Sequence, residues 1–69
     1  MSYLYLAILK EGYTVNEEVT IYLNEHQIVL LDIYENLGLI KIASPELILN
    51  LPFFIEAIEL EKQYTLEEE

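Results

Sequence analysis

Residues 25–37 read EHQIVLLDIYENL, and the secondary structure of this stretch decides the fold. On a helix its apolar side chains would form two stripes rather than one. The stripes consist of Val29, Leu30, Ile33 and Leu37, and of Ile28, Leu31 and Tyr34. An apolar arc this wide is typical of a helix that is covered on two sides.

Residues at both ends of this stretch favour a helix. Asn24 is a favourable N-cap residue, and Glu25 suits the positive end of a helix dipole. Gly38 is the kind of residue that commonly follows the last helical turn. We therefore predict a helix over residues 25–37.

The segment before residue 25 has the pattern of two strands. Tyr3–Leu9 is rich in aromatic and branched side chains, which favours a strand that is largely covered on both faces. Gly12 provides a turn signal. Val19–Leu23 alternates between apolar and more polar side chains, which is the period of a strand. We predict that these two strands form an antiparallel hairpin.

The segment after residue 38 contains two prolines that shape the prediction. Leu39–Ile42 is either a short strand or an extended connection. Ser44 followed by Pro45 and an acidic residue is typical of a helix start, whereas Pro52 interrupts a helix. We predict a short helical turn over residues 45–50 and a main helix over residues 52–63.

These elements together predict an α+β fold. The expected architecture is an N-terminal antiparallel β-hairpin packed on two α-helices, the second of them split or kinked at Pro52. The 69 residues suffice for a single domain, 1–69, with a frayed acidic tail at residues 64–69. The chain has no cysteine, which excludes disulfides and thiolate metal sites.

Composition indicates a protein that works by contact with a partner. Hydrophobic residues make up 54% of the chain, more than so small a core easily absorbs, so we expect a homo-oligomer or an obligate hetero-complex. Thirteen acidic residues against three basic ones give a net charge of -10. This charge disfavours direct binding to nucleic acid or to an anionic membrane and matches a partner protein with a basic surface.

The sequence shows little that would support catalysis. His26 is the single histidine, and its position beside Glu25 fits a surface or capping-turn residue better than a general base. The chain has only two glycines, too few for a glycine-rich phosphate loop, and a single aspartate, Asp32, among dispersed glutamates. We therefore expect no enzyme activity, no cofactor and no metal site. No apolar run approaches the roughly 18–20 residues of a membrane span, so we expect a cytoplasmic protein.

Part of the chain resembles a family of dimeric DNA-binding proteins. Val19–Leu23, followed by Asn24 and the stretch over 25–37, resembles the ribbon and first helix of ribbon-helix-helix repressors, and Ile55–Ile58 is similar to their second helix. Residues 34–40 are similar to the end of a MerR-type recognition helix. The resemblance implies an obligate dimer, but residues 13–39 contain no Lys or Arg with which such proteins read DNA.

The function that we predict is that of a small acidic inhibitor or adaptor. It would bind a nucleic-acid-handling or defence protein, as phage- or plasmid-type inhibitors, DNA mimics and antitoxins do, through an apolar patch rimmed by carboxylates. The alternatives are a dimeric ribbon-helix-helix or helix-turn-helix-like transcriptional regulator and a structural subunit of a larger assembly. The candidate protein-binding residues are Phe53, Phe54, Glu56, Glu59, Tyr22 and Tyr34. For the two phenylalanines, a place in the core is the competing interpretation.

Overall fold

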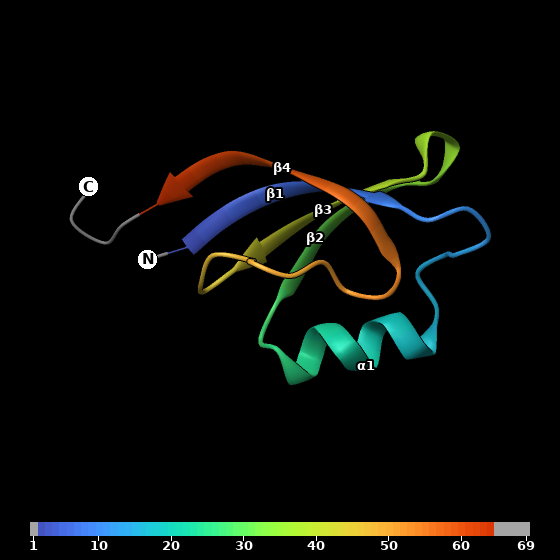
Figure 1. Ribbon diagram of the computed structural model, residues 1–69, viewed down its shortest axis with the longest axis horizontal. Helices are drawn as coiled ribbons and strands as arrows, with labels where there is room; N and C mark the ends of the chain where they lie inside the picture. The colour runs from blue at the N-terminus through green and yellow to red at the C-terminus, as the bar shows by residue number, and fades with distance from the viewer. Residues whose placement is uncertain (1, 65–69) are drawn as a thin grey trace.

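A computed structural model describes residues 2–64 and shows one four-stranded antiparallel sheet with one α-helix (Figure 1). Its elements in chain order are β1 (Ser2–Leu9), α1 (Glu17–Glu25), β2 (Val29–Tyr34), the 3-10 turn η1 (Glu35–Leu37), β3 (Leu39–Ser44) and β4 (Ile55–Tyr64). The strand order is β2-β3-β1-β4, so β1 and β3 are central and β2 and β4 lie at the edges.

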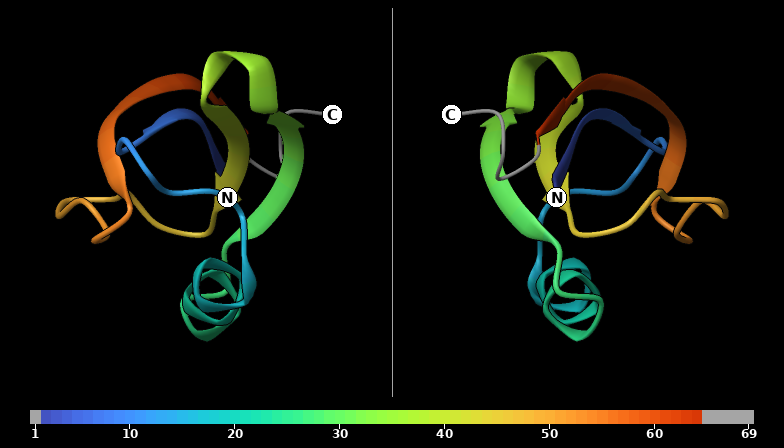
Figure 2. Two further views of the ribbon diagram at one scale, coloured as in Figure 1. Left: turned by 90° about the vertical axis from the view of Figure 1, so that its right-hand side faces the viewer. Right: turned by 90° about the vertical axis from the view of Figure 1, so that its left-hand side faces the viewer.

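The topology is that of a ferredoxin-like, split βαβ arrangement with one helix missing. In that arrangement a helix connects the first two strands and a second helix connects the last two. Here α1 connects β1 to β2, whereas residues 45–54 run from β3 to β4 without forming a helix. We call residues 45–54 the crossover segment. It lies on the same side of the sheet as α1 (Figure 2).

The predicted architecture, a β-hairpin packed on two helices, is wrong. Two of its parts are confirmed: the predicted strand Tyr3–Leu9 lies within β1, and Leu39–Ile42 belongs to β3 rather than to an extended connection. In most of the other segments, a predicted helix is a strand in the structure or a predicted strand is a helix. The errors have identifiable local causes in three segments.

The first error concerns residues 19–23, which form the middle of α1. The Asn16 side chain caps this helix, because its Oδ1 accepts a hydrogen bond of 3.0 Å from the N–H of Val19. Val19 and Leu23 are four residues apart and are both buried, so they satisfy the helical period as well as the strand period. Ile21, expected on the same face, is exposed. The ribbon on which the resemblance to ribbon-helix-helix repressors depended is therefore absent from the described chain.

The second error concerns residues 25–37, where the structure has the end of α1, then β2 and η1. The helix ends at Glu25, and Gln27 reverses the chain with a φ of 60°. The two predicted stripes do not match the two faces of the strand: Leu30 and Ile33 pair with buried β3 residues, whereas Val29, from the same predicted stripe, lies on the opposite face. Gly38 does adopt a left-handed conformation, with φ 67°, but it closes the β2–β3 hairpin.

The third error concerns residues 45–63. The Ser44 hydroxyl accepts a hydrogen bond of 3.3 Å from the N–H of Glu46, as an N-cap would, yet the chain continues in an irregular, extended form. Residues 55–64 form β4, so the helix predicted after Pro52 is also wrong. The alternation of Ile58 and Leu60 with glutamates is a strand period. Tyr64 belongs to β4, and residues 65–69 of the predicted tail lie outside the described residues.

One hydrophobic core lies between the sheet and the layer formed by α1 and the crossover segment. Its buried members are Tyr5, Ala7, Val19, Leu23, Ile28, Ile40, Ile42, Phe54 and Ile55. They come from β1, β3, β4 and α1, together with Ile28 just before β2 and Phe54 at the end of the crossover segment, so the core fixes how these elements pack. Within residues 2–64, no helix has the length and apolar character needed to cross a membrane.

Candidate protein-binding surface

The sheet has one face packed against the core and one face turned away from it (Figure 2). In β1, Tyr5 and Ala7 point into the core, so Leu4, Leu6 and Ile8 point to the opposite side. We call this opposite side the open face. Its described residues include Leu4, Leu6, Ile8, Val29, Asp32, Tyr34, Leu39, Lys41, Ala43, Ala57 and Glu59.

Aliphatic side chains occupy most of the open face. The register places Ile8 between Leu39 and Ala57, and Leu6 between Lys41 and Glu59. Ile8 keeps 44% of its surface exposed, although it lies on a central strand. A shallow apolar hollow lies beside it and is lined by Leu6, Ile8, Leu39, Ala57, Ile58 and Glu59.

Charged groups border these aliphatic side chains. Lys41 Nζ lies 3.6 Å from Glu61 Oε1, so this ion pair spans β1 and divides the open face. In the register of β2 with β3, Asp32 lies opposite Lys41, and on β4 Glu59 lies opposite Leu6. The described part of the open face therefore has an aliphatic centre, one cation that is already paired, and carboxylates along both outer strands.

The candidate residues from the sequence do not form one patch. Phe54 is fully buried in the core, whereas Phe53 keeps 41% of its surface exposed on the α1 side. Phe53 packs edge-on against Tyr22, with ring centroids 5.8 Å apart. Glu56 and Glu59 lie on β4, and Tyr34 ends β2. The structure thus brings Tyr22 and Phe53 together on the side opposite to the open face. Glu59 belongs to the open face, and so does Tyr34, which pairs with Leu39 at the end of β2.

Sequence reasoning missed the aliphatic residues of the open face. Leu4, Leu6 and Ile8 were interpreted as covered, because apolar residues on both faces of a strand usually indicate a sheet buried on both sides. That pattern was the available signal. Within residues 2–64 no helix covers the second face, where Ile8 and Val29 are exposed, while other exposed apolar side chains, such as Leu37 and Leu49, lie outside this face.

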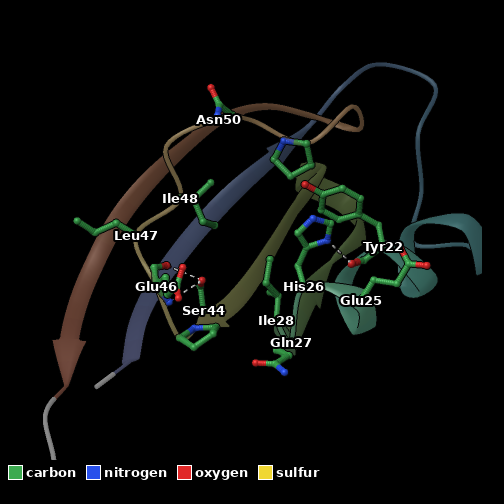
Figure 3. A pocket seen from close by; sticks show the side chains of 12 residues that line it. Tyr22, Glu25, His26, Gln27, Ile28, Ser44, Glu46, Leu47, Ile48 and Asn50 are labelled. Atoms are coloured by element: carbon green, nitrogen blue, oxygen red, sulfur yellow. Dashed lines mark hydrogen bonds between the residues drawn. The ribbon is translucent and has the colours of Figure 1, made fainter.

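A pocket lined by both polar and apolar side chains lies between α1 and the crossover segment (Figure 3). His26 stacks on Tyr22 with ring centroids 4.0 Å apart, and its Nδ1 lies 2.9 Å from the Tyr22 carbonyl oxygen. The Ser44 hydroxyl donates to the Glu46 carbonyl oxygen at 2.6 Å. These polar groups therefore bond to local backbone rather than to one another, an arrangement that stabilises the α1 end and the Ser44 turn.

The described residues contain no group of three His, Asp or Glu side chains placed to hold a metal ion. In comparisons of sequence and structure, no protein-family model, no curated protein and no solved structure matches this chain. The described residues therefore form a small domain with a four-stranded antiparallel sheet, one face of which packs against a helix while no described helix covers the other.

Proposed function

We propose that this protein is a small protein-binding inhibitor or adaptor whose open face docks on a partner protein. The observation that carries the proposal is the row of aliphatic side chains on the central strands, where Leu6 and Ile8 lie beside Leu39 and no helix of the described residues covers them. Exposed apolar surface of this kind marks sites of association. Docking would remove it from water and stabilise the complex by roughly 25 cal/mol per Å² of apolar surface buried.

Charge favours a basic partner over a second copy of this chain. The net charge is -10, and carboxylates of Asp32, Glu59 and Glu61 lie along the outer strands of the open face. Two copies would bring these carboxylates together, whereas Lys and Arg around an apolar patch would complement them. The partner that fits has a flat apolar surface bordered by basic side chains.

Basic surfaces of this kind are common on proteins that handle nucleic acids. An acidic domain that covers such a surface would inhibit the protein by occupying its phosphate-binding region, and this action fits a phage- or plasmid-type inhibitor in the cytoplasm. The charge that supports this role also opposes direct binding to DNA. A DNA-binding regulator has lost its main support, because residues 19–23 form part of α1.

The proposal is tested by site-specific photocrosslinking in cells. A photoreactive amino acid replaces Ile8 on the open face or, as a matched control, Ile21 on α1, since both isoleucines are exposed to a similar extent. We expect position 8, and not position 21, to form an adduct with another protein rich in surface Lys and Arg. Adducts from position 21 alone, or covalent dimers of this chain from position 8, would contradict the proposal.

A further inference from the structure

The two outer edges of the sheet differ in how their backbone groups are used. An edge strand exposes N–H and C=O groups that can pair with another extended chain. β2 and β4 are the edge strands here (Figure 1). Whether a given N–H or C=O group points toward the neighbouring strand or out from the edge follows from the hydrogen bonds at one end of the sheet.

Two hydrogen bonds establish these directions. Leu9 N–H donates to the Gly38 carbonyl oxygen at 2.9 Å, and Lys10 N–H donates to the Phe54 carbonyl oxygen at 3.0 Å. Because backbone groups alternate in direction along antiparallel strands, Ile8 must exchange hydrogen bonds with Ala57. The same alternation continues along each strand wherever the pairing is regular, between the bulges.

The outer edge of β2 is closed to an incoming strand. The alternation directs the N–H of Ile33 outward, and this N–H donates to Asp32 Oδ1 at 2.8 Å. A bulge between Leu30 and Asp32 also breaks the regular spacing of outward groups. A capped donor and a bulge are devices that protect sheet edges from pairing.

The outer edge of β4 is open in its middle. The alternation directs the backbone groups of Ile58 and Leu60 outward, two residues apart as a regular strand requires. No described side chain or backbone oxygen accepts from either N–H outside the sheet ladder. The pairing with β1 is regular from Ala57 to Leu60, and irregularities follow only beyond these residues.

Side chains around this edge specify what an incoming strand would carry. Ile58 is half-buried and Leu60 is exposed on the α1 side of β4, so neighbouring side chains there are expected to be apolar. Glu59 lies on the other side, where an opposite charge is favourable across neighbouring strands. The complementary segment therefore alternates apolar and basic residues.

We propose that the outer edge of β4 at residues 58–60 binds an extended peptide segment in which apolar residues alternate with Lys or Arg. The segment adds as a short fifth strand and pairs with the backbone groups of Ile58 and Leu60. This site goes beyond the proposed function, because strand addition at the edge does not require the open face to be occupied.

The test uses a capped synthetic peptide of alternating valine and lysine. On addition to the isotope-labelled protein, we expect the amide signals of Ile58 and Leu60 to shift and their hydrogen exchange to slow. The amide of Ile33, at the closed edge, is the internal control and should not change. Shifts confined to Leu6, Ile8 and Leu39 on the open face would overturn the proposal without contradicting the proposed function.

The principal rival is non-specific attraction between a cationic peptide and an acidic protein. A peptide of identical charge, N-methylated at the amides that would pair, separates the two because it keeps the charge but loses the donors. We expect its affinity to fall by about tenfold or more, in line with the loss of hydrogen bonds. Equal affinity of the two peptides would overturn the proposal.

Variants of the protein provide the complementary test. Leu60→Pro removes an outward N–H that the sheet does not use, so it should weaken binding about tenfold while the unfolding transition remains cooperative. Glu59→Gln should weaken binding severalfold, whereas Glu35→Gln removes the same charge away from the edge and should not. If Leu60→Pro fails to fold, the N-methylated peptide with the unaltered protein decides the question. Equal effects of the two glutamate substitutions would count against the site.

Discussion

The hydroxyl of Tyr5, a buried residue of β1, accepts a hydrogen bond of 3.0 Å from the backbone N–H of Ile48 in the crossover segment. This bond joins residues 43 positions apart and anchors the part of the chain that replaces a second helix. Ile48 is half-buried beneath β1, while Leu47 and Leu49 on either side of it are exposed. One tyrosine hydroxyl therefore helps to hold an otherwise irregular segment against the core.

Tyr5→Phe should lower the free energy of unfolding by about 1 kcal/mol, because it leaves the Ile48 N–H without its acceptor in a partly buried place. Chemical denaturation measures this change. Hydrogen exchange should accelerate at Ile48 more than at amides within the sheet. An unchanged exchange rate at Ile48 would show that the hydroxyl does not anchor the crossover segment.

Phe54→Ala should destabilise the protein by about 3–5 kcal/mol, because it empties a fully enclosed site in the core. Phe53→Ala is the matched control, and since Phe53 is partly exposed it should cost distinctly less. Thermal and denaturant unfolding of both variants checks the difference. An equal loss of stability in the two variants would contradict the structure, in which Phe54 is enclosed and Phe53 is partly exposed.

Asn16→Ala should reduce stability by about 1 kcal/mol through loss of the cap on the N–H of Val19. Asn16→Asp keeps an acceptor oxygen and adds a charge that favours the helix N-terminus, so it should preserve stability. Urea unfolding distinguishes the three proteins. A loss in the aspartate variant as large as in the alanine variant would contradict the assigned cap.

Asp32→Ala should increase self-association, because it frees the outward N–H of Ile33 on an apolar edge strand. Sedimentation at increasing protein concentration measures the effect. Glu35→Gln removes the same charge next to the strand without freeing an edge amide, and it should sediment like the unaltered protein. Self-association of both variants to the same extent would assign the effect to charge alone.

The strands that could be predicted from the sequence are those whose side-chain pattern does not also fit a helix. Tyr3–Leu9 and Leu39–Ile42 have branched and aromatic side chains and lack a helix cap, and they form β1 and part of β3. Residues 25–37 were wrongly predicted to be a helix because Asn24 and Gly38 resemble helix boundaries. The residue that caps a helix in the structure is Asn16, which precedes α1. Tertiary pairing of Leu30 with Ile42 and of Ile33 with Ile40 overrides those local signals.

Composition led to the expectation of an apolar patch rimmed by carboxylates, and it does not say where such a patch lies. The excess of apolar residues and of carboxylates indicated a patch rimmed by acids, and this expectation was attached to a helix around Phe53 and Glu56 that does not form. The open face depends on the register of Leu6 with Lys41 and Glu59, which are far apart in the sequence. Such long-range pairing cannot be obtained from local periodicity.

The central claim is that the open face, and not the α1 side, binds the partner, and one comparison of affinities tests it most directly. The crosslinked partner, once identified and purified, is titrated with the unaltered protein, Ile8→Glu and Ile21→Glu, two identical substitutions at exposed isoleucines on opposite sides of the sheet. We predict that Ile8→Glu weakens binding by about 30-fold or more, as burial of an unpaired charge in an apolar contact requires, while Ile21→Glu binds like the unaltered protein and both variants remain folded. Unchanged affinity of Ile8→Glu, or a loss confined to Ile21→Glu, would contradict the account.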